Sequence, residues 1–308
     1  MSIKKLRVGV VGVGAIGSNH ARLYGEIPSA EFTAVYDIDL TKGNSIGRKF
    51  GATSAKSLDE FIDMIDAASV ATPTNTHYQI ARSLLARGKH LLVEKPITDK
   101  TTHASKLAQL AAGNGLILQV GHVERFNPVL GTLEKYLTHP RFIEAHRLSP
   151  YPNRNTDIGV VLDLMIHDLE IILHFVRSPV KKIDAVGVPV LSRGEDIANA
   201  RLRFENGCVA NVTSSRISPE RMRKIRVFQE DAYLSLDYQN QSGEIYRRAG
   251  GRITRDKVGI EREEPLKRQL TSFIECAITG REPRVSGAQA AAALELAVKI
   301  TKRIASKV

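Results

Sequence analysis

The sequence predicts a chain of two domains, an α/β domain with a doubly wound parallel sheet followed by an α+β domain with a mostly antiparallel sheet. The first 120 residues alternate short β-branched runs with helical patterns, and a glycine-rich turn joins the first run to the first helix. After Gly121 this alternation gives way to strand-like segments in series. We therefore expect one domain over residues 1–120 and the other over residues 121–308.

In the first domain, apolar and β-branched runs predict strands that alternate with amphipathic helices. The strands are expected at Leu6–Val11, Glu31–Tyr36, Ala68–Ala71, His90–Val93 and Leu116–Val120. The helices are expected at Ala15–Gly25, Leu40–Phe50, Leu58–Met64, Thr76–Ala86 and Thr101–Ala112.

In the second domain, the pattern predicts helices at both ends and a series of strands between them. The first helix is expected at Pro128–Tyr136, and a longer apolar helix at Val160–Val176. The strands are expected at Phe142–Leu148, Ile183–Val190, Ala198–Phe204, Val209–Arg216, Lys224–Phe228 and Tyr233–Leu236. The closing helices are expected near Leu266–Thr279 and Gln289–Ile304.

The composition is that of a globular chain, with 43% hydrophobic and 25% charged residues among 308. The first residues lack a signal-peptide pattern, and no apolar run approaches the roughly 20 residues that span a bilayer, so we expect a soluble, cytoplasmic protein without a membrane partner. Two cysteines, Cys208 and Cys276, are too few for a structural metal site. No metal is expected.

The net charge is strongly positive, because 44 Lys and Arg face 33 Asp and Glu, which gives +11. Such a charge favours an anionic partner: nucleic acid, a membrane surface or a phosphorylated small molecule. The sequence has neither a helix-turn-helix pattern nor an RNA-binding aromatic signature, so a nucleic-acid partner is not expected.

Gly12, Gly14 and Gly17 follow the first predicted strand and open the first helix in GxGxxG spacing. This arrangement allows a tight turn, close approach of a pyrophosphate and close helix packing. Asp37 follows Gly17 by twenty residues at the end of the second strand, where a carboxylate can bind both ribose hydroxyls. The sequence therefore predicts NAD as cofactor; Lys42 nearby leaves NADP open, and the alternative is a glycine-rich turn with a solvated aspartate.

Two further loops follow strand ends, where ligands bind in open α/β sheets. The loop Ala71–His77 contains Pro73, and its Asn75 or Thr76 could cap the next helix, while His77 could equally be a surface histidine. The loop Glu94–Pro96 contains a lysine that could polarise a substrate hydroxyl or simply be solvated.

Asp163 and His167 lie four residues apart on one face of the predicted apolar helix. A polar pair on a buried helix is either a structural histidine bonded to a carboxylate or a general base oriented by one.

The GxGxxG turn, the Ala71–His77 loop, Glu94-Lys95-Pro96, Gly121–Pro128 and the Asp163/His167 pair occur in the order typical of the Gfo/Idh/MocA oxidoreductases, and the resemblance covers the whole chain. The resemblance implies an N-terminal Rossmann domain and a C-terminal domain with an open sheet that commonly forms the oligomer interface, hence a homodimer or homotetramer. It places Lys95 in the family's EKP motif, with a cis Lys95–Pro96 bond, and Asp163 and His167 in its DxxxH motif. The implied cofactor contacts are Gly12, Val13, Gly14, Ala15, Ile16, Asp37, Thr72, Thr74, His77, Glu94 and Lys95.

For the reaction, we expect NAD-dependent oxidation of a sugar hydroxyl. We assign His167 as base, Lys95 as electrostatic stabiliser or proton relay, and Asp163 as the orienting group, although Lys95 and His167 could exchange roles. Three segments, Asn155–Val161, Gly121–Pro128 and Glu264-Pro-Leu, are most similar to the UDP-N-acetylglucosamine 3-dehydrogenases. The expected reaction is then oxidation of the 3-hydroxyl of UDP-N-acetylglucosamine to a 3-keto sugar.

A nucleotide-sugar substrate is anionic, and arginine suits bidentate phosphate contacts. Arg125, Arg147 and Arg154 are candidates for this contact, although each could be a surface salt-bridge residue. The expected substrate contacts are Lys95, Arg125, Asn127, Arg154, Asp163 and His167.

Three alternatives stay open: a dehydrogenase of another sugar or cyclitol, an NAD-dependent glycosidase on the same fold, and a non-catalytic sugar or nucleotide sensor. Net NADH formation would separate a dehydrogenase from the glycosidase. Loss of Lys95 or His167 would indicate a sensor, and both residues are present.

Overall fold

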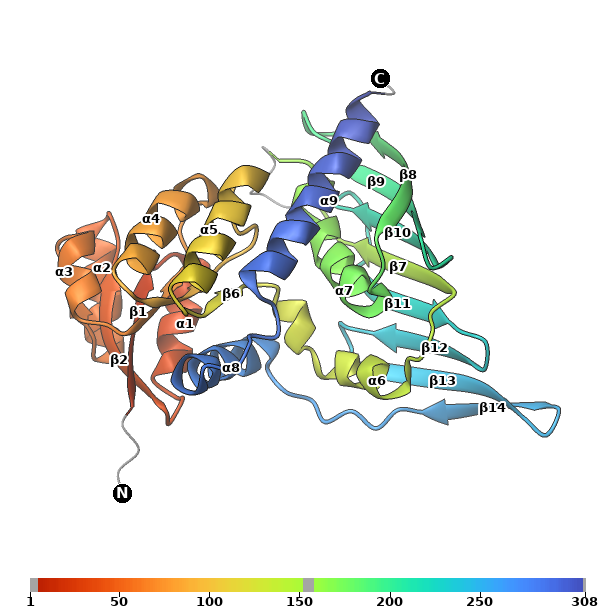
Figure 1. Ribbon diagram of the computed structural model, residues 1–308, viewed down its shortest axis with the longest axis horizontal. Helices are drawn as coiled ribbons and strands as arrows, with labels where there is room; N and C mark the ends of the chain where they lie inside the picture. Colours follow the sequence, from red (N-terminus) through yellow and green to blue (C-terminus); the bar gives the residue numbers. More distant parts are fainter. Residues whose placement is uncertain (1–4, 152–157, 307–308) are drawn as a thin grey trace. The chain divides into compact units, whose positions relative to one another are not determined.

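The computed structural model describes residues 5–151 and 158–306. It divides the chain into two compact units, each with its own sheet (Figure 1). The first unit extends to Val123 and takes in Glu264–Ala291, whereas the second takes in Glu124–Glu263 and the residues after Ala291. Residues 264–291, which the sequence analysis placed in the C-terminal domain, therefore lie with the first unit.

A six-stranded parallel sheet forms the centre of the first unit, in the order β3-β2-β1-β4-β5-β6. Its strands are β1 (Leu6–Val11), β2 (Ala30–Tyr36), β3 (Thr53–Ser54), β4 (Ala67–Val70), β5 (His90–Val93) and β6 (Leu118–Val120). The predicted doubly wound sheet is thus confirmed, with the two-residue β3 added at one edge. The strand order reverses between β1 and β4, the position at which open α/β sheets bind ligands beyond the carboxyl ends of their strands.

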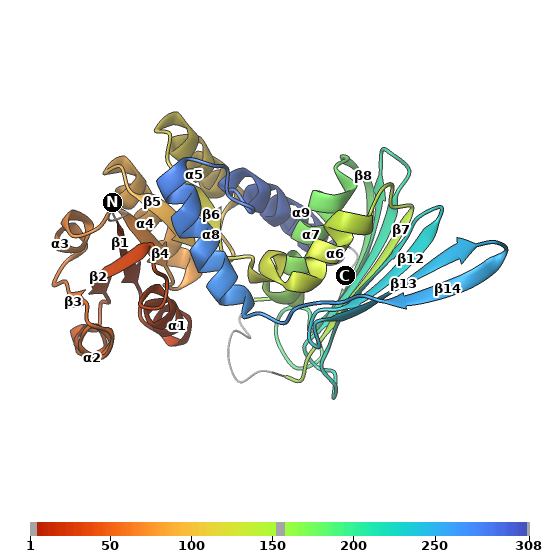
Figure 2. The same cartoon turned by 90° about the horizontal axis from the view of Figure 1, so that it is seen from below.

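Helices cover both faces of this sheet, as right-handed crossovers require (Figure 2). The helices are α1 (Ala15–Tyr24), α2 (Leu40–Phe50), α3 (Leu58–Asp63), α4 (Thr74–Ala86) and α5 (Thr101–Gly113). Helix α8 (Pro265–Thr279) adds Leu270, Phe273 and Ile274 to the core formed by β1 and α1. This burial is the physical reason why α8 belongs to the first unit.

An eight-stranded sheet forms the second unit, in the order β14-β13-β12-β11-β7-β10-β9-β8. Its strands are β7 (Phe142–Leu148), β8 (Val180–Val188), β9 (Ile197–Phe204), β10 (Val209–Ser215), β11 (Met222–Phe228), β12 (Ala232–Asp237), β13 (Ser242–Ala249) and β14 (Arg252–Lys257). Neighbouring strands are antiparallel except β7 and β10, which run parallel. The expected mostly antiparallel sheet is confirmed.

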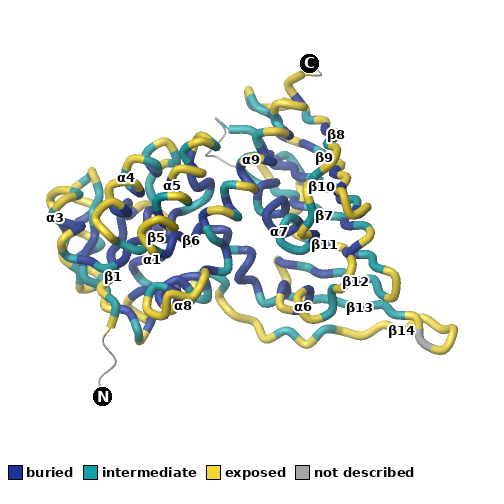
Figure 3. Tube along the Cα trace, viewed as in Figure 1, coloured by how far each residue is buried: buried dark blue, intermediate teal, exposed yellow. Residues whose placement is uncertain are grey.

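The hairpin of β13 and β14 is missing from the sequence prediction. Every residue of β14 is exposed, so the strand lacks the alternation of buried and exposed side chains by which strands are recognised (Figure 3).

One face of the second sheet is covered by α6 (Pro128–Tyr136), α7 (Ile166–Val176) and the last turns of α9 (Gly287–Ala305) (Figure 2). The opposite face presents a row of neighbouring rings, Phe142, Phe228, Tyr233 and Tyr246, whose adjacent centroids lie 5.7, 4.5 and 5.1 Å apart; the first pair is tilted and the other two are stacked. No helix in the described part of the chain is long and apolar enough to cross a membrane.

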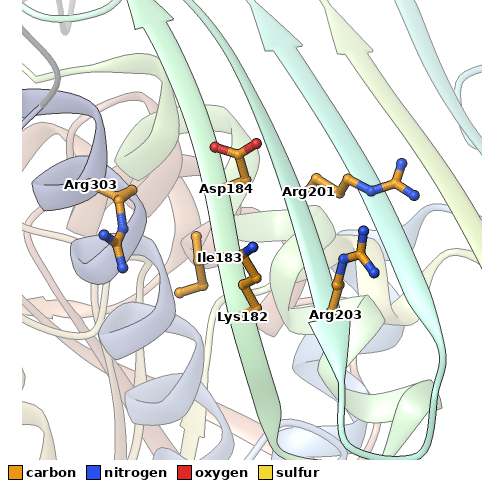
Figure 4. A pocket seen from close by; sticks show the side chains of 6 residues that line it. All are labelled: Lys182, Ile183, Asp184, Arg201, Arg203 and Arg303. Atoms are coloured by element: carbon orange, nitrogen blue, oxygen red, sulfur yellow. The ribbon is translucent and has the colours of Figure 1, made fainter.

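At the β8 edge of this sheet lies a cavity of about 320 Å³ with a mostly basic lining (Figure 4). Cross-strand pairing sets Lys182 opposite Arg203 and Asp184 opposite Arg201, and Ile183 and Arg303 complete the lining. These side chains account for part of the positive charge, and none of them is a predicted site residue.

Candidate functional site

The glycine-rich turn between β1 and α1 has the geometry that the sequence predicts. Gly12 has φ +83°, and a Cβ there would lie 2.7 Å from the Thr72 methyl group. A Cβ on Gly17 would lie 1.8 Å from the carbonyl oxygen of Gly12. These two positions therefore exclude a side chain.

Gly14 differs, because a Cβ there would meet no atom within 4 Å. Gly14, Ala15 and Ile16 are exposed at the start of α1, and no side chain caps this helix end. Val13 is buried beneath them. The open position and the uncapped N-terminus fit a pyrophosphate, which binds where backbone N–H groups and the helix dipole converge.

Asp37 lies at the carboxyl end of β2, next to this turn. Its Oδ2 accepts a hydrogen bond from the N–H of Val13 at 2.8 Å, and its Oδ1 accepts one from the N–H of Asp39 at 2.9 Å. Lys42 pairs with Asp39 rather than Asp37, at 3.3 Å. The residues present thus fit the ribose and diphosphate of NAD.

The loop after β4 and the loop after β5 are joined by His77. Its Nε2 lies 2.8 Å from the carbonyl oxygen of Thr72, and its Nδ1 lies 3.0 Å from that of Pro96. His77 is buried, so the surface-histidine alternative is wrong, and burial lowers the pKa of its imidazole. The histidine therefore holds two loops at the carboxyl edge of the sheet.

Helix α4 begins at Thr74, two residues earlier than predicted, with Pro73 as its N-cap residue. The expected capping by Asn75 or Thr76 is corrected accordingly, since no side chain caps this helix. The hydroxyl of Thr76 bonds instead to the Thr72 hydroxyl at 2.8 Å and to the Pro73 carbonyl at 2.7 Å.

Glu94 and Lys95 follow β5, and the Lys95–Pro96 bond is cis, as expected. The Glu94 carboxylate lies 3.4 Å from Nε2 of His20, a fully buried histidine on α1. A Cβ on Gly121 would lie 2.5 Å from Glu94 Oε1. His20 was not singled out from the sequence, because a lone histidine within a helix has no distinguishing pattern.

All of these groups lie beyond the carboxyl ends of parallel strands. Backbone bonds continue between neighbouring strands at this edge: Gly12 to Tyr36, Ala71 to Val11 and Glu94 to Val70. The structure therefore brings together the predicted cofactor contacts, Gly12 to Ile16, Asp37, Thr72, Thr74, His77, Glu94 and Lys95, along one edge of the first sheet.

In the second unit, Asp163 and His167 occupy one continuous segment. Asp163 lies in a π-helical turn, η2 (Val161–Met165), and His167 lies in the first turn of α7. The helix predicted over Val160–Val176 is present, but Val161–Met165 form a π-helical turn rather than an α-helical one. Both side chains are half-buried, and π-helical turns occur frequently at functional sites.

Arg125 and Arg147, which the sequence suggested as phosphate contacts or as surface salt-bridge residues, are buried in internal ion pairs. Arg125 Nη1 lies 3.0 Å from Glu170 Oε1, and Arg147 binds both Asp168 and Glu124. The surface salt-bridge alternative is therefore corrected as well.

Asn127 is also buried and used internally. Its side-chain oxygen accepts a bond from the N–H of Val129 and caps α6, while its amide donates to the Tyr238 carbonyl at 3.0 Å. Arg154 lies outside the described residues.

Comparison with known proteins gives two family matches. Residues 6–122 match the oxidoreductase family with an NAD-binding Rossmann fold, and residues 134–235 match the GFO/IDH/MocA C-terminal domain.

Among curated relatives, the chain is 34% identical over 285 residues to UDP-N-acetylglucosamine 3-dehydrogenase from Acidithiobacillus ferrooxidans, across 90% of each chain. It is 24% identical to scyllo-inositol 2-dehydrogenase (NAD(+)) from Bacillus subtilis, across 96% of this chain and 93% of that one.

Among solved structures, the same Acidithiobacillus enzyme superposes with a TM-score of 0.93 at 31% identity, over 97% of this chain and 98% of that one. Levoglucosan dehydrogenase in complex with NADH and levoglucosan gives a TM-score of 0.91 at 17% identity, over 99% and 98% of the two chains, and supports the fold alone.

Proposed function

The chain belongs to the Gfo/Idh/MocA family of NAD-binding oxidoreductases, and we propose that it oxidises the 3-hydroxyl of UDP-N-acetylglucosamine to a 3-keto sugar. The observation that most supports this substrate is the 34% identity, over 90% of each chain, to the UDP-N-acetylglucosamine 3-dehydrogenase from Acidithiobacillus ferrooxidans. Lys95, Asp163 and His167 supply the polar groups that such an oxidation requires.

In the proposed cofactor site, Asp37 receives the ribose hydroxyls, and the start of α1 receives the diphosphate. The support is the exposed surface of Gly14, Ala15 and Ile16 and the fixed carboxylate of Asp37. The negative charge of Asp37 repels a 2′-phosphate, which favours NAD over NADP.

NAD, when bound, supplies the acceptor for the hydride that leaves the carbinol carbon. We assign the remaining chemistry to this chain. His167 takes the hydroxyl proton, Lys95 stabilises the developing alkoxide or relays the proton, and Asp163 orients the substrate or the imidazole. The reverse assignment, with Lys95 as the base and His167 as the alkoxide stabiliser, is also compatible with this proposal.

For substrate binding, we propose Arg154 as a diphosphate contact. Arg125 and Asn127 remain in the proposed set, although both are engaged within the second unit. Anchoring the remote diphosphate would hold the sugar carbinol in place for reaction, so truncated sugars should react poorly.

The second candidate function is oxidation of a cyclitol, which the similarity to inositol dehydrogenases favours. We also propose that the enzyme is a homodimer or homotetramer associating through the helix-free face of the second sheet. The row of neighbouring rings on that face supports this proposal.

A substrate panel followed by NADH absorbance tests the function. We expect NADH release with UDP-N-acetylglucosamine, and little with equal concentrations of N-acetylglucosamine, glucose or myo-inositol. Faster turnover of myo-inositol would transfer the assignment to a cyclitol dehydrogenase. Release of free sugar without net NADH would indicate an NAD-dependent glycosidase.

A further inference from the structure

The segment that carries Asp163 and His167 is held at both ends by buried charged side chains. We infer that Glu195 and Arg147 are positioning residues that fix the π-helical turn η2 and the start of α7, and with them Asp163 and His167. The inference rests on the proposed function, because positioning matters only if these two groups react with substrate.

Glu195 holds the beginning of the turn. Its backbone oxygen accepts a hydrogen bond from the N–H of Val160 at 2.8 Å, and its carboxylate accepts one from the N–H of Val161 at 3.3 Å. The first N–H groups of a helix have no partner within the helix, and a negative charge there is stabilised by the helix dipole. Glu195, which is 8% exposed, supplies both the hydrogen-bond acceptors and the negative charge, although it lies far from this turn in the sequence.

The backbone around Gly159 makes this contact close. A Cβ on Gly159 would lie 2.1 Å from Glu195 Oε1, and a Cβ on Gly194 would lie 3.1 Å from Gly159 Cα. The carboxylate therefore lies directly against the main chain that leads into the turn, and any side chain at residue 159 would displace it.

Glu195 is itself fixed by its neighbour Asp196. The Asp196 carboxylate accepts hydrogen bonds from the N–H groups of Val190, Leu191 and Ser192, at 2.8, 2.6 and 2.9 Å. It also binds Arg216 Nε at 2.7 Å, and these bonds hold the pKa of Asp196 well below its usual range. Arg216 in turn donates to the Ile158 carbonyl at 2.6 Å, just before the turn.

Arg147 holds the other end of the segment. Its Nε and Nη2 bind the two carboxylate oxygens of Asp168 at 2.7 and 3.0 Å, and its Nη1 binds Glu124 at 2.9 Å. Asp168 directly follows His167 and is 1% exposed. A two-point arginine–carboxylate contact fixes orientation as well as distance, so it sets the rotation of the first turn of α7.

Stability alone does not account for these networks. Buried ion pairs lose about as much free energy in desolvation as they gain in attraction, and apolar replacements are often equally stable. A π-helical turn is a rare backbone arrangement that occurs frequently at functional sites. The networks hold the beginning of this turn and the first turn of α7 that follows it.

The test compares Glu195→Ala and Arg147→Lys with Glu195→Gln, which retains an acceptor for the Val161 N–H. Small displacements of reacting groups cost up to about 100-fold in rate, so we expect kcat to fall at least tenfold in the first two variants. KM for NAD should change by less than about twofold, because the cofactor contacts lie in the other unit. Glu195→Gln should retain most of the turnover.

Ile245→Ala in β13 is the matched control, because it removes buried apolar contacts far along the sheet. It should lower the unfolding temperature while leaving kcat unchanged. The inference is overturned if the loss of kcat per degree of lowered unfolding temperature is the same in Ile245→Ala as in Glu195→Ala and Arg147→Lys. Glu195 and Arg147 would then be merely structural.

An NMR titration of the His167 ring separates this inference from the proposed function, with His167→Gln used to identify its signals. In Glu195→Ala and Arg147→Lys these signals should shift and broaden, and in Ile245→Ala they should stay in place. If no sugar is oxidised by the unmodified enzyme, the function fails while these signals still decide the inference. Unchanged signals in both variants would refute it.

Discussion

The carboxylate of Asp37 accepts a hydrogen bond from the N–H of Val13 at 2.8 Å, so the residue proposed to select the cofactor also holds the turn proposed to bind its phosphates. Residue 37 lies at the end of β2 and residue 13 lies after β1, two strands that pair in parallel. Because parallel strands end at the same edge, one side chain can serve both purposes. Substitutions of Asp37 therefore have to separate charge from hydrogen bonding.

We predict that the unmodified protein binds NAD far more tightly than NADP, and that Asp37→Asn narrows the difference. A hydrogen bond to a charged group contributes about 1.5–3 kcal/mol, so NAD affinity should fall about 10- to 100-fold. NADP affinity should change less, because the repulsion of its 2′-phosphate is removed. Isothermal titration with both cofactors measures this.

Asp37→Ala is the companion variant, since it also removes the acceptor for the Val13 N–H. It should bind NAD more weakly than Asp37→Asn does. Equal affinity of the unmodified protein for NAD and NADP would contradict the assignment of Asp37.

Gly14→Ala and Gly17→Ala form a matched pair. They distinguish a glycine that leaves room for the cofactor from a glycine that leaves room for the protein's own backbone. A methyl group at residue 14 meets no protein atom within 4 Å, whereas one at residue 17 meets a backbone oxygen at 1.8 Å. Gly14→Ala should therefore weaken NAD binding and leave the unfolding temperature nearly unchanged. Gly17→Ala should lose about 1–3 kcal/mol of stability, or more, as well as NAD binding.

Calorimetry of the two cofactor-free variants and NAD titration provide the comparison. An unaltered NAD affinity in Gly14→Ala would show that the diphosphate does not lie over this glycine.

Most of the fold of the first unit could be predicted because β1, β4, β5 and β6 are largely buried on both faces and appear as apolar runs. The second unit was predicted less well. The exposed β14 has no alternation, and the π-helical turn at Val161 has the same apolar pattern as an α-helix. We infer that the geometry of this turn depends on Glu195, which follows Val161 by 34 residues in the sequence.

The sequence could predict that the proposed cofactor contacts lie along one edge of the first sheet, because these residues follow the ends of strands at fixed spacings. The burial of Arg125 and Arg147 could not be predicted, for the opposite reason. Their carboxylate partners Glu170, Asp168 and Glu124 are close only after folding, so an arginine that will be buried looks the same in sequence as one that will be exposed.

His77 should make stability depend on pH. Burial lowers the pKa of its ring in the folded state, whereas the unfolded chain has a value of about 6.5. Below that value the unfolded state binds more protons, so the contribution of His77 is complete above about pH 6.5 and is lost as the pH falls toward the lower folded value. The unfolding temperature should be lower at about pH 5.5 than at about pH 7.5.

His77→Gln should reduce this difference, because the amide does not titrate but can still donate to a loop carbonyl. The exposed His139→Gln is the control and should leave the pH dependence as it is. A pH dependence that is identical in His77→Gln and the unmodified protein would exclude His77 as its source.

Lys95→Ala and His167→Ala should each lower kcat by about 100-fold or more, the range for loss of a positioned acid or base. Their side chains are half-buried, at the end of β5 and in the first turn of α7. NAD affinity should stay nearly unchanged in His167→Ala, because residue 167 lies outside the Rossmann unit, and should fall only modestly in Lys95→Ala. The exposed Lys100→Ala, on the loop between β5 and α5, controls for loss of positive charge and should retain full turnover.

Steady-state kinetics with UDP-N-acetylglucosamine, measured as a pH profile of kcat/KM, separates the roles of Lys95 and His167. Removing the base should abolish the acidic limb of the profile. Removing the alkoxide stabiliser should lower the whole profile without moving that limb. A variant that keeps near-normal turnover would identify its residue as structural.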